Sequence, residues 1–211
     1  MLVISLLAVL GCNELPSREA QEQALLHVAE LPTPSEENTL FIDFRKSEAY
    51  QEGHIPGALN LSRDAIENPS YAYGGMLADR THMEKVLSDL GITNDHQLII
   101  YDDQGLPEAA RMWWALKHYG FPDVKLLNGG IQAWTEAGNP TESERVKPES
   151  GTYTFPSSPS LGKLITKEEL FDLINSKEQS YVLVDTRSKK EFTGARWKAG
   201  AAKAGRIPTS V

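Results

Sequence analysis

The sequence predicts an α/β protein with a parallel sheet covered by helices on both faces, in one complete domain followed by an incomplete second copy. Two observations support this fold class. Short apolar runs alternate with segments of helical periodicity, and the strand–helix pattern starts twice along the chain. The 211 residues are 40% hydrophobic and 24% charged, which favours a packed core and excludes a disordered, collagen-like or disulfide-stapled chain.

The N-terminus resembles the export signal of a bacterial lipoprotein. Leu2–Leu10 is an apolar run interrupted only by Ser5, too short to span a bilayer as a helix but typical of a secretory signal. Val9-Leu10-Gly11-Cys12 follows the lipobox pattern. We therefore predict a lipoprotein signal at residues 1–12, lipid attachment at Cys12, and a tether at residues 13–37.

This interpretation places the protein on the periplasmic or outer face of a membrane, held there by a lipid anchor. No Lys or Arg precedes the apolar run, which is unusual for a signal. The alternative is a buried first strand with a core cysteine, in a cytoplasmic protein.

The strands of the first domain, residues 38–140, are predicted from short apolar runs bounded by polar or turn residues. Such runs, apolar throughout, indicate strands buried on both faces of a parallel sheet. They lie at Thr39–Ile42, Leu59–Leu61, Leu98–Tyr101 and Val124–Leu127.

Helices follow three of these strands. Thr81 with Glu84 has the pattern of a capping box, and Gly91 suits the end of that helix. Pro107 suits the first turn of a helix that runs past Trp113 and Trp114 to Gly120. Asn128-Gly129-Gly130 turns into a further helix that carries Ile131 and Trp134.

A change of composition marks the end of this domain. Residues 141–163 are rich in Pro, Ser, Thr and Glu, and we interpret them as a linker. The pattern then restarts: Thr166 with Glu169 forms a second capping box, and Tyr181–Val184 is an apolar run. We assign residues 164–211 to the N-terminal part of a second domain.

An internal repeat relates the two domains. Asp43-Phe44-Arg45 and Asp185-Thr186-Arg187 each end an apolar run, and an aromatic residue lies seven positions after each aspartate. Gly53-His54-Ile55-Pro56 then corresponds to Gly205-Arg206-Ile207-Pro208, with about ten extra residues before it in the second copy. The second copy has no counterpart of Leu98–Tyr101 or Val124–Leu127.

At these positions the chain resembles the rhodanese family, specifically its tandem-domain sulfurtransferases acting on thiosulfate or 3-mercaptopyruvate. The resemblance covers residues 38–211. The matching segments are Asp43-x-Arg45, Gly53-His54-Ile55-Pro56-Gly57-Ala58, Ala110-Arg111-x-Trp113-Trp114, Leu127-Asn128-Gly129-Gly130-Ile131-x-Ala133-Trp134, Asp185-Thr186-Arg187 and Gly205-Arg206-Ile207-Pro208.

The resemblance implies transfer of sulfane sulfur to cyanide or a thiol through a cysteine persulfide. A loop entering a helix N-terminus lowers a cysteine pKa and stabilises the anionic persulfide. In this family the cysteine directly follows a strand, where this chain has Asp102. A carboxylate cannot carry sulfane sulfur, so we expect no catalytic residue in this chain and a working cysteine beyond Val211 in the intact protein.

The motif residues could also have other roles. Asp102-Asp103 could be a nucleophile or metal ligand, but no lysine, histidine or third carboxylate follows at useful spacing. We expect Asp43 and Arg45 to be a structural ion pair or loop brace, and we assign Asp185 and Arg187 to the structural motif of the second copy. Gly53-His54 is expected to form a turn, in which His54 as a general base is the less favoured alternative.

Few cofactors or macromolecular partners fit this composition. One cysteine and five histidines without paired spacing argue against a metal site, and we expect no cofactor. The net charge of −8 argues against nucleic acid. A small sulfur compound is the expected substrate of the intact protein. The alternative function is a non-catalytic rhodanese-fold binding or regulatory module.

Overall fold

The computed structural model describes residues 24–31, 38–71, 74–103, 105–157, 164–176, 180–197, 199 and 201–211. It divides into two units, which we call unit 1 (Met1–Gly162) and unit 2 (Lys163–Val211). The lipoprotein signal predicted at residues 1–12, including Cys12, lies outside the described residues.

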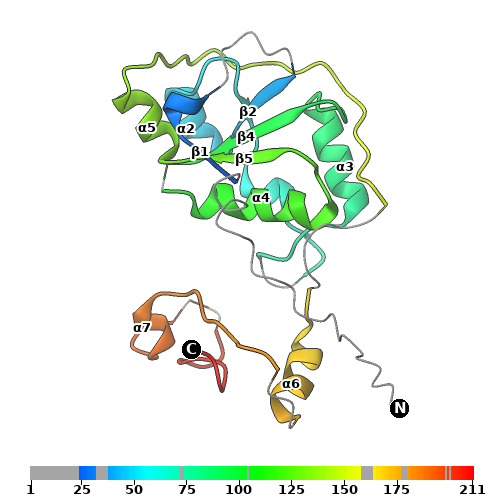
Figure 1. The fold of residues 1–211 in the computed structure, drawn as a ribbon, viewed down its shortest axis with the longest axis vertical. Coiled ribbons are helices and arrows are strands. Elements are labelled where there is room, and N and C mark those ends of the chain that lie inside the picture. The colour runs from blue at the N-terminus through cyan, green and yellow to red at the C-terminus, as the bar shows by residue number, and fades with distance from the viewer. Residues whose placement is uncertain are drawn as a thin grey trace, which may run out of the picture. The chain divides into compact units, whose positions relative to one another are not determined.

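A five-stranded parallel sheet forms the centre of unit 1, in the order β1-β5-β4-β2-β3. This confirms the predicted fold class (Figure 1). β2 pairs with β4 along its whole length, from Thr39↔Gln97 to Asp43↔Tyr101. The strands are β1 (Leu25–Leu26), β2 (Thr39–Asp43), β3 (Leu59–Asn60), β4 (Gln97–Tyr101) and β5 (Val124–Leu127).

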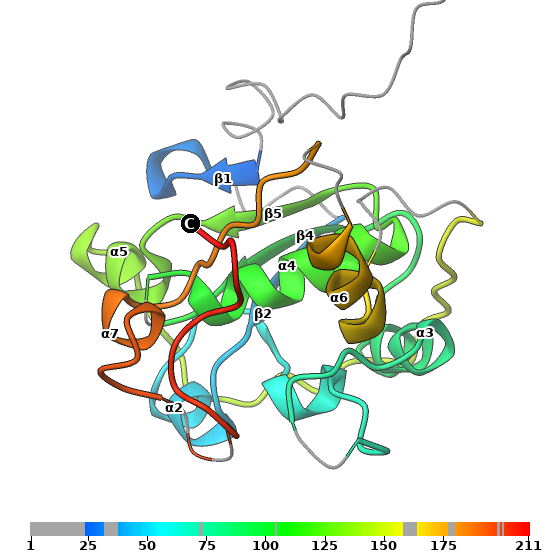
Figure 2. The same cartoon turned by 90° about the horizontal axis from the view of Figure 1, so that it is seen from below.

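Helices cover both faces of this sheet because residues on each strand alternate between two cores. Ile42, Leu98 and Ile100 belong to the larger core, together with residues of α3 (Arg80–Asp89) and α4 (Pro107–Tyr119). Ile99 and Tyr101 face the smaller core, with Ile131 of α5 (Gly130–Glu136). Figure 2 shows α4 lying against the sheet.

The shorter elements of unit 1 are α2 (Ser47–Glu52) and two 3-10 helices, η1 (Val28–Glu30) and η2 (Arg63–Ile66). α2 follows β2, and η2 follows β3. Both therefore begin at the carboxyl edge of the sheet, where parallel strands deliver their loops.

The helix caps match the sequence at α4 and differ at α3. Pro107 opens α4, and Gly120 ends it with a φ of 93°. α3 begins two residues earlier than the Thr81–Glu84 pattern predicts, because Asp79 caps it by accepting a hydrogen bond from His82 N (2.9 Å). Glu84 instead accepts a hydrogen bond from Phe155 N (2.9 Å).

Part of the predicted tether is an edge of the sheet. Leu25 and Leu26 pair with Leu126 and Leu127 of β5, and Leu26, Val28 and Leu31 pack against the smaller core. The apolar cluster at 24–28 is too short to give a periodic pattern, and its partner strand lies about a hundred residues away. The ordered part of unit 1 therefore starts before residue 38.

Most of the predicted linker is also part of unit 1. Residues 139–157, which we call the strap, have almost no regular secondary structure, yet Tyr153 and Phe155 are 2% and 4% exposed and belong to the larger core. Tyr153 stacks on Phe121 (ring centroids 5.0 Å apart). Backbone hydrogen bonds that a strand would satisfy in a sheet are made instead to side chains, including Ser88 and Asn94.

Unit 2 contains α6 (Lys167–Asn175), opened by the predicted Thr166–Glu169 capping box, and α7 (Lys189–Phe192). The predicted strand Tyr181–Val184 is not formed as a strand. Its backbone pairs at one point only, through Asp185 N to Val211 O and Val211 N to Leu183 O, both 2.9 Å. Without neighbouring strands, Val182 and Val184 are 77% and 62% exposed.

Candidate functional site

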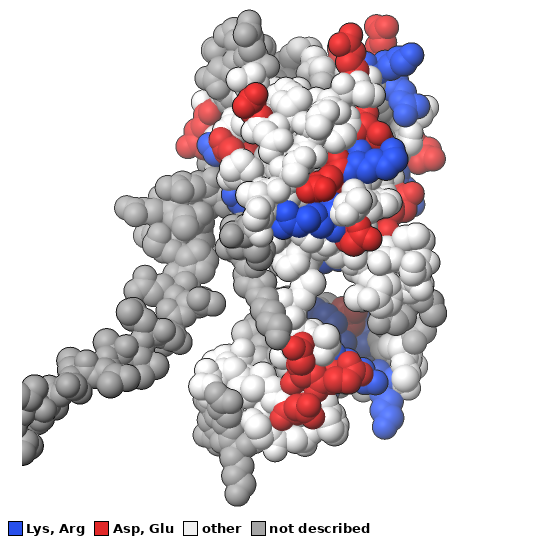
Figure 3. All heavy atoms as spheres, turned by 90° about the vertical axis from the view of Figure 1, so that its right-hand side faces the viewer, with Lys and Arg blue, Asp and Glu red and all other residues white. Residues whose placement is uncertain are grey.

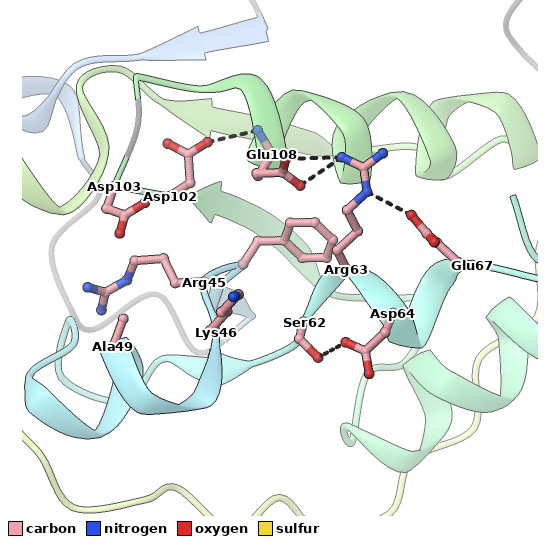
Figure 4. A pocket seen from close by; sticks show the side chains of 11 residues that line it. Arg45, Lys46, Ala49, Ser62, Arg63, Asp64, Glu67, Asp102, Asp103 and Glu108 are labelled. Atoms are coloured by element: carbon pink, nitrogen blue, oxygen red, sulfur yellow. Dashed lines mark hydrogen bonds and ion pairs between the residues drawn. The ribbon is translucent and has the colours of Figure 1, made fainter. Parts of the chain in front are cut away.

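A cavity of about 590 Å³ opens at the carboxyl ends of β2, β3 and β4 (Figure 4). Within the sheet, β3 lies next to β2 on one side and β4 lies next to β2 on the other. The cavity is therefore at the point where the strand order reverses. Open α/β sheets bind their ligands at this point. The lining residues are Phe44, Arg45, Lys46, Ala49, Ser62, Arg63, Asp64, Glu67, Asp102, Asp103 and Glu108.

Asp102 follows β4 directly and is 1% exposed. Its carboxylate accepts hydrogen bonds from the backbone N–H groups of Leu106 (2.9 Å), Glu108 (3.0 Å) and Ala109 (3.1 Å). These N–H groups lie at the N-terminus of α4, where partial positive charge favours an anion. The chain's own carboxylate thus occupies these three N–H groups, which we call the cradle.

The backbone of Asp102 is fixed from the other side by α5. Its carbonyl oxygen accepts a hydrogen bond from Ile131 N (3.0 Å). A Cβ atom at Gly130 would lie 2.1 Å from that oxygen, and Gly130 has a φ of +58°. The Gly129-Gly130 pair therefore allows α5 to start against the loop that carries Asp102.

Arg63 crosses the rim of the cavity and is held by two carboxylates. It donates to Glu67 (2.8 Å) and to both carboxylate oxygens of Glu108 (2.9 and 3.0 Å). The hydrogen bond from Arg63 lowers the pKa of Glu67. Burial lowers the pKa of the neighbouring Arg111, and repulsion from Arg63 adds to this.

Asp43 and Arg45 form a buried ion pair at the end of β2. Arg45 binds both carboxylate oxygens, with Nη2 at 2.6 Å and Nε at 2.9 and 3.2 Å, and its Nη2 also donates to Gly53 O (2.7 Å). Burial opposes the charge of Arg45, but the Asp43 carboxylate outweighs it and raises the Arg45 pKa. This ion pair, which we call the brace, ties the end of β2 to the turn before β3.

Tyr101 connects the brace to β4. Its hydroxyl donates to Asp43 Oδ2 (2.8 Å) and accepts from Ile55 N (3.1 Å). Burial, reinforced by the Asp43 charge, raises the pKa of Tyr101 far above its ordinary value. Tyr101 therefore stays protonated and serves as a hydrogen-bond donor.

His54 lies away from the cavity, fully buried under the strap. Its Nδ1 is 2.9 Å from Tyr50 O, and its ring stacks on Tyr50 with centroids 3.7 Å apart. Its backbone exchanges two hydrogen bonds with Glu142 (2.8 and 2.9 Å). His54 cannot reach a substrate in the cavity, so it has no general-base role there.

Unit 2 contains a second brace with nearly the same geometry. Arg187 binds Asp185 with Nη2 at 2.6 Å and Nε at 2.9 and 3.2 Å, and donates to Gly205 O (2.9 Å). The hydrogen bonds from Arg187 lower the pKa of Asp185 to about 2. Here the Arg187 side chain is 45% exposed, against 8% for Arg45.

A cavity of about 530 Å³ in unit 2 is lined by Leu183–Arg187, Lys203–Ile207 and Ser210. The corresponding residues of unit 1 include Asp43, Ile55 and Ala58, which Tyr101 contacts or packs with. This cavity thus corresponds to a part of the unit 1 core that strand β4 fills, and not to the cavity around Asp102.

Within the described ranges, no group of three or more His, Cys, Asp or Glu side chains is arranged to hold a metal ion. In the same part of the chain, no helix is long and apolar enough to cross a membrane. On the face shown in Figure 3, Lys and Arg side chains lie among Asp and Glu and do not gather into one basic patch.

Sequence reasoning missed the residues that complete this site. Arg63 and Glu108 are 45 positions apart, and neither belongs to a recognisable motif. Tyr101 was identified only as the end of a strand. The contact between its hydroxyl and Asp43 could have been inferred, because the two residues end neighbouring parallel strands at the same edge of the sheet.

Comparison with known proteins matches residues 27–137 to the rhodanese-like domain model. Mouse (Mus musculus) thiosulfate sulfurtransferase is 33% identical over 149 residues, covering 70% of this chain and 49% of the relative. Mouse 3-mercaptopyruvate sulfurtransferase is 30% identical over 165 residues, covering 77% of this chain and 54% of the relative.

Among solved structures, SseA from Escherichia coli, a 3-mercaptopyruvate sulfotransferase, has the same fold. Its TM-score is 0.72 at 24% identity, covering 83% of this chain and 68% of SseA. This chain spans about half the length of the curated relatives it matches. On its sequence motifs, its sheet topology and the matched domain model, the chain belongs to the rhodanese family.

Proposed function

We propose that the chain is the N-terminal part of a tandem-domain sulfurtransferase. The intact protein would move sulfane sulfur from thiosulfate or 3-mercaptopyruvate to cyanide or a thiol. A thiolate of the second domain attacks the outer sulfur of thiosulfate, forming an S–S bond to the enzyme and releasing sulfite. The persulfide then gives this sulfur to the acceptor, which regenerates the thiolate.

The observation that carries this proposal is the repeated brace. Asp185, Arg187 and Gly205 reproduce the contacts of Asp43, Arg45 and Gly53 to within about 0.2 Å. Unit 2 thus begins the same domain fold, while Asp102 occupies the cradle of unit 1. Basic residues also outnumber acidic ones in residues 163–211, and the reverse holds in residues 1–162. This charge favours anionic sulfur donors near unit 2.

A cyanide-dependent thiosulfate assay tests the proposal. The protein encoded by the full reading frame should be active. It should lose activity when the cysteine of its second domain, at the position that corresponds to Asp102, is replaced by serine. The 211-residue chain should show no turnover, because its one cysteine, Cys12, does not lie at the position after a strand where the family pattern places the catalytic cysteine. Turnover by this chain that survived Cys12→Ala would overturn the proposal.

The proposed membrane anchor rests on Cys12. Expression in a bacterium with labelled palmitate should label the wild-type protein and leave Cys12→Ala unlabelled. The wild type should also sediment with membranes. Stable attachment requires more than one acyl chain, and the resemblance to lipoproteins implies several chains on Cys12. Absence of label from a wild type that carries upstream basic residues would overturn the lipoprotein proposal and favour the core-strand alternative.

A non-catalytic binding module is the second candidate, favoured by the carboxylate that fills the cradle of unit 1. The reading frame after Val211 distinguishes the two functions. A continuation that includes a cysteine loop and a second Gly-Gly turn supports the enzyme, whereas a stop codon supports the module.

A further inference from the structure

Among the described residues, His54 is the only histidine that is fully buried. Its ring stacks on Tyr50 of α2 with 12° between the planes, and its backbone exchanges two hydrogen bonds with Glu142 of the strap. Its Nε2 atom is buried and has no hydrogen-bond partner in the part of the chain that the structure describes. A buried polar atom in this state costs free energy until it gains a partner.

The contacts of the His54 ring fix where its hydrogen lies. Nδ1 is 2.9 Å from Tyr50 O, and a carbonyl oxygen only accepts hydrogen bonds, so Nδ1 carries the hydrogen. In a neutral imidazole the other nitrogen then has a bare lone pair. Nε2 lies 3.6 Å from Glu142 Oε1. Two acceptors therefore face each other, and a proton between them is missing.

A proton from solvent at Nε2 would give His54 a partner on every side. The imidazolium keeps its hydrogen bond to Tyr50 O and directs a second N–H group at Glu142. The ring of Tyr50, 3.7 Å away between centroids, offers its face to the cation. Glu142 already accepts a hydrogen bond from Gly57 N (2.8 Å) and its side chain is 39% exposed. Glu142 can thus remain a carboxylate while the proton lies on His54.

Other charges near His54 do not provide an alternative partner. Contacts of His54 and its neighbours bring the following titratable groups near it: Tyr50 on α2, Glu142 and Arg145 on the strap, Tyr101 on β4, and Asp43 and Arg45 of the brace. Burial and Arg145 oppose a cation here. The brace is an ion pair with little net charge, and Tyr101 stays protonated. Glu142 is therefore the group that can balance an imidazolium.

We propose that His54 and Glu142 form a proton-operated latch that fastens the strap to the turn before β3. The strap is also held at this end by Val146 N, which donates to the Tyr50 hydroxyl (3.2 Å). The latch contributes fully below about pH 6.5, where histidine in the unfolded chain is protonated as well. Its contribution is lost as rising pH removes the Nε2 proton from the folded chain. The pH thus controls how firmly the strap is closed over His54.

Long-range ¹H–¹⁵N spectra of the histidine rings test the latch, using the full 211-residue chain. At pH 8.5 the His54 ring should carry its hydrogen on Nδ1 with Nε2 bare, and at pH 5.5 both nitrogens should be protonated. Glu142→Gln removes the balancing charge, so the second protonation should require a proton concentration about fivefold higher, the effect of one partly exposed ion pair. The matched control Glu144→Gln removes an exposed carboxylate of the same strap and should leave the titration unchanged.

Urea unfolding at pH 5.5 and pH 8.5 tests whether this proton stabilises the fold. The ratio of the two folding equilibrium constants should be about fivefold larger in the wild type and Glu144→Gln than in Glu142→Gln, since the other titrating groups cancel in this comparison. Three results would overturn the proposal: a neutral His54 ring with its hydrogen on Nε2, an Nε2 that stays bare at pH 5.5, or equal effects of the two glutamate substitutions, which would indicate only the general field of an acidic chain.

Discussion

At the scale of single residues, Asp102 shows how one buried carboxylate holds the backbone that begins α4. Its buried carboxylate accepts backbone hydrogen bonds from Leu106, Glu108 and Ala109. In the family pattern this position carries a cysteine, whose persulfide requires the same N–H groups. In this chain the Asp102 carboxylate itself binds these N–H groups.

Asp102→Asn should therefore destabilise unit 1. The side chain keeps its shape, but one accepting oxygen becomes an NH₂ group that faces backbone donors. An unsatisfied buried donor costs about 1–3 kcal/mol, so the free energy of unfolding in urea should fall by about that amount. Asp103→Asn, which removes a carboxylate without such hydrogen bonds, should change it by less than about 0.5 kcal/mol. Equal effects would show that Asp102 does not hold the loop.

The brace of unit 2 predicts a titration at very low pH. The hydrogen bonds from Arg187 lower the pKa of Asp185 to about 2, against about 3.9 for an unperturbed aspartate. Because the folded-state pKa is the lower one, this brace stabilises unit 2 above about pH 3.9, and its contribution is lost as the pH falls through 2. The carboxyl ¹³C shift of Asp185 should report this midpoint.

The control for this titration is Arg187→Ala. Removal of the guanidinium should return the Asp185 midpoint to near 3.9. A wild-type midpoint that is already near 3.9 would mean that the brace is not formed in solution.

At the scale of elements, the strap replaces a strand or helix in covering the larger core. Tyr153 and Phe155 pack around Phe121 and Tyr119, and Arg80 lies over the rings of Tyr119 and Phe155. Near Gly91 the two backbones come so close that a Cβ atom at Gly151 would lie 2.7 Å from Gly91 C. The strap is thus fixed at close range.

Two substitutions at Tyr153 and Phe155 should have opposite effects. The buried Tyr153 hydroxyl has no hydrogen-bond partner in the part of the chain that the structure describes, and burial raises the pKa of Tyr153 strongly. Tyr153→Phe should therefore raise the free energy of unfolding by about 1 kcal/mol. Phe155→Ala should lower it by about 3 kcal/mol through loss of buried area and the cavity left behind. Urea denaturation measures both. A neutral Phe155→Ala would show that the strap does not pack on the core.

The strap also shows which elements the sequence could predict. The central strands and α4 were predicted because their apolar periodicity is local. Gly151–Phe155 has the alternation of a half-buried strand, but Pro and Ser around it favoured a linker. Leu25–Leu26 forms a strand only because β5 offers an open edge. The α3 cap was misplaced because Asp79 and Thr81 are both good caps, and Glu84 has a partner 71 positions away.

At the scale of the whole molecule, the two units differ in how completely they bury apolar side chains. Among described residues, the exposed large hydrophobic side chains belong mostly to unit 2; they include Leu164, Ile165, Phe171, Val182, Val184, Trp197, Ile207 and Val211. A chain of about fifty residues is near the size below which a domain usually needs disulfides, metals or a partner to be stable, and unit 2 leaves these apolar side chains uncovered. The internal repeat predicted one complete copy of the domain followed by a partial one. It did not show where unit 1 ends.

Fragments should locate that boundary. A fragment of residues 24–157 should unfold cooperatively in urea, because it retains the sheet and the strap. A fragment of residues 24–140 should be less stable by several kcal/mol, since it exposes the core surface that Tyr153 and Phe155 cover. Residues 164–211 alone should give a disordered circular dichroism spectrum. Equal stability of the first two fragments would return the boundary to residue 140.

The strap has a consequence for synthesis on the ribosome. The chain emerges from its N-terminus, and domains tend to fold as units as they emerge. β5 and α5 complete the sheet before residue 140, but the core beside Phe121 stays open until Phe155 has left the exit tunnel. During that interval the nascent chain presents an apolar surface to chaperones. A pause in translation when residue 140 has just left the tunnel would prolong this exposure, whereas a pause after residue 157 has left the tunnel would not.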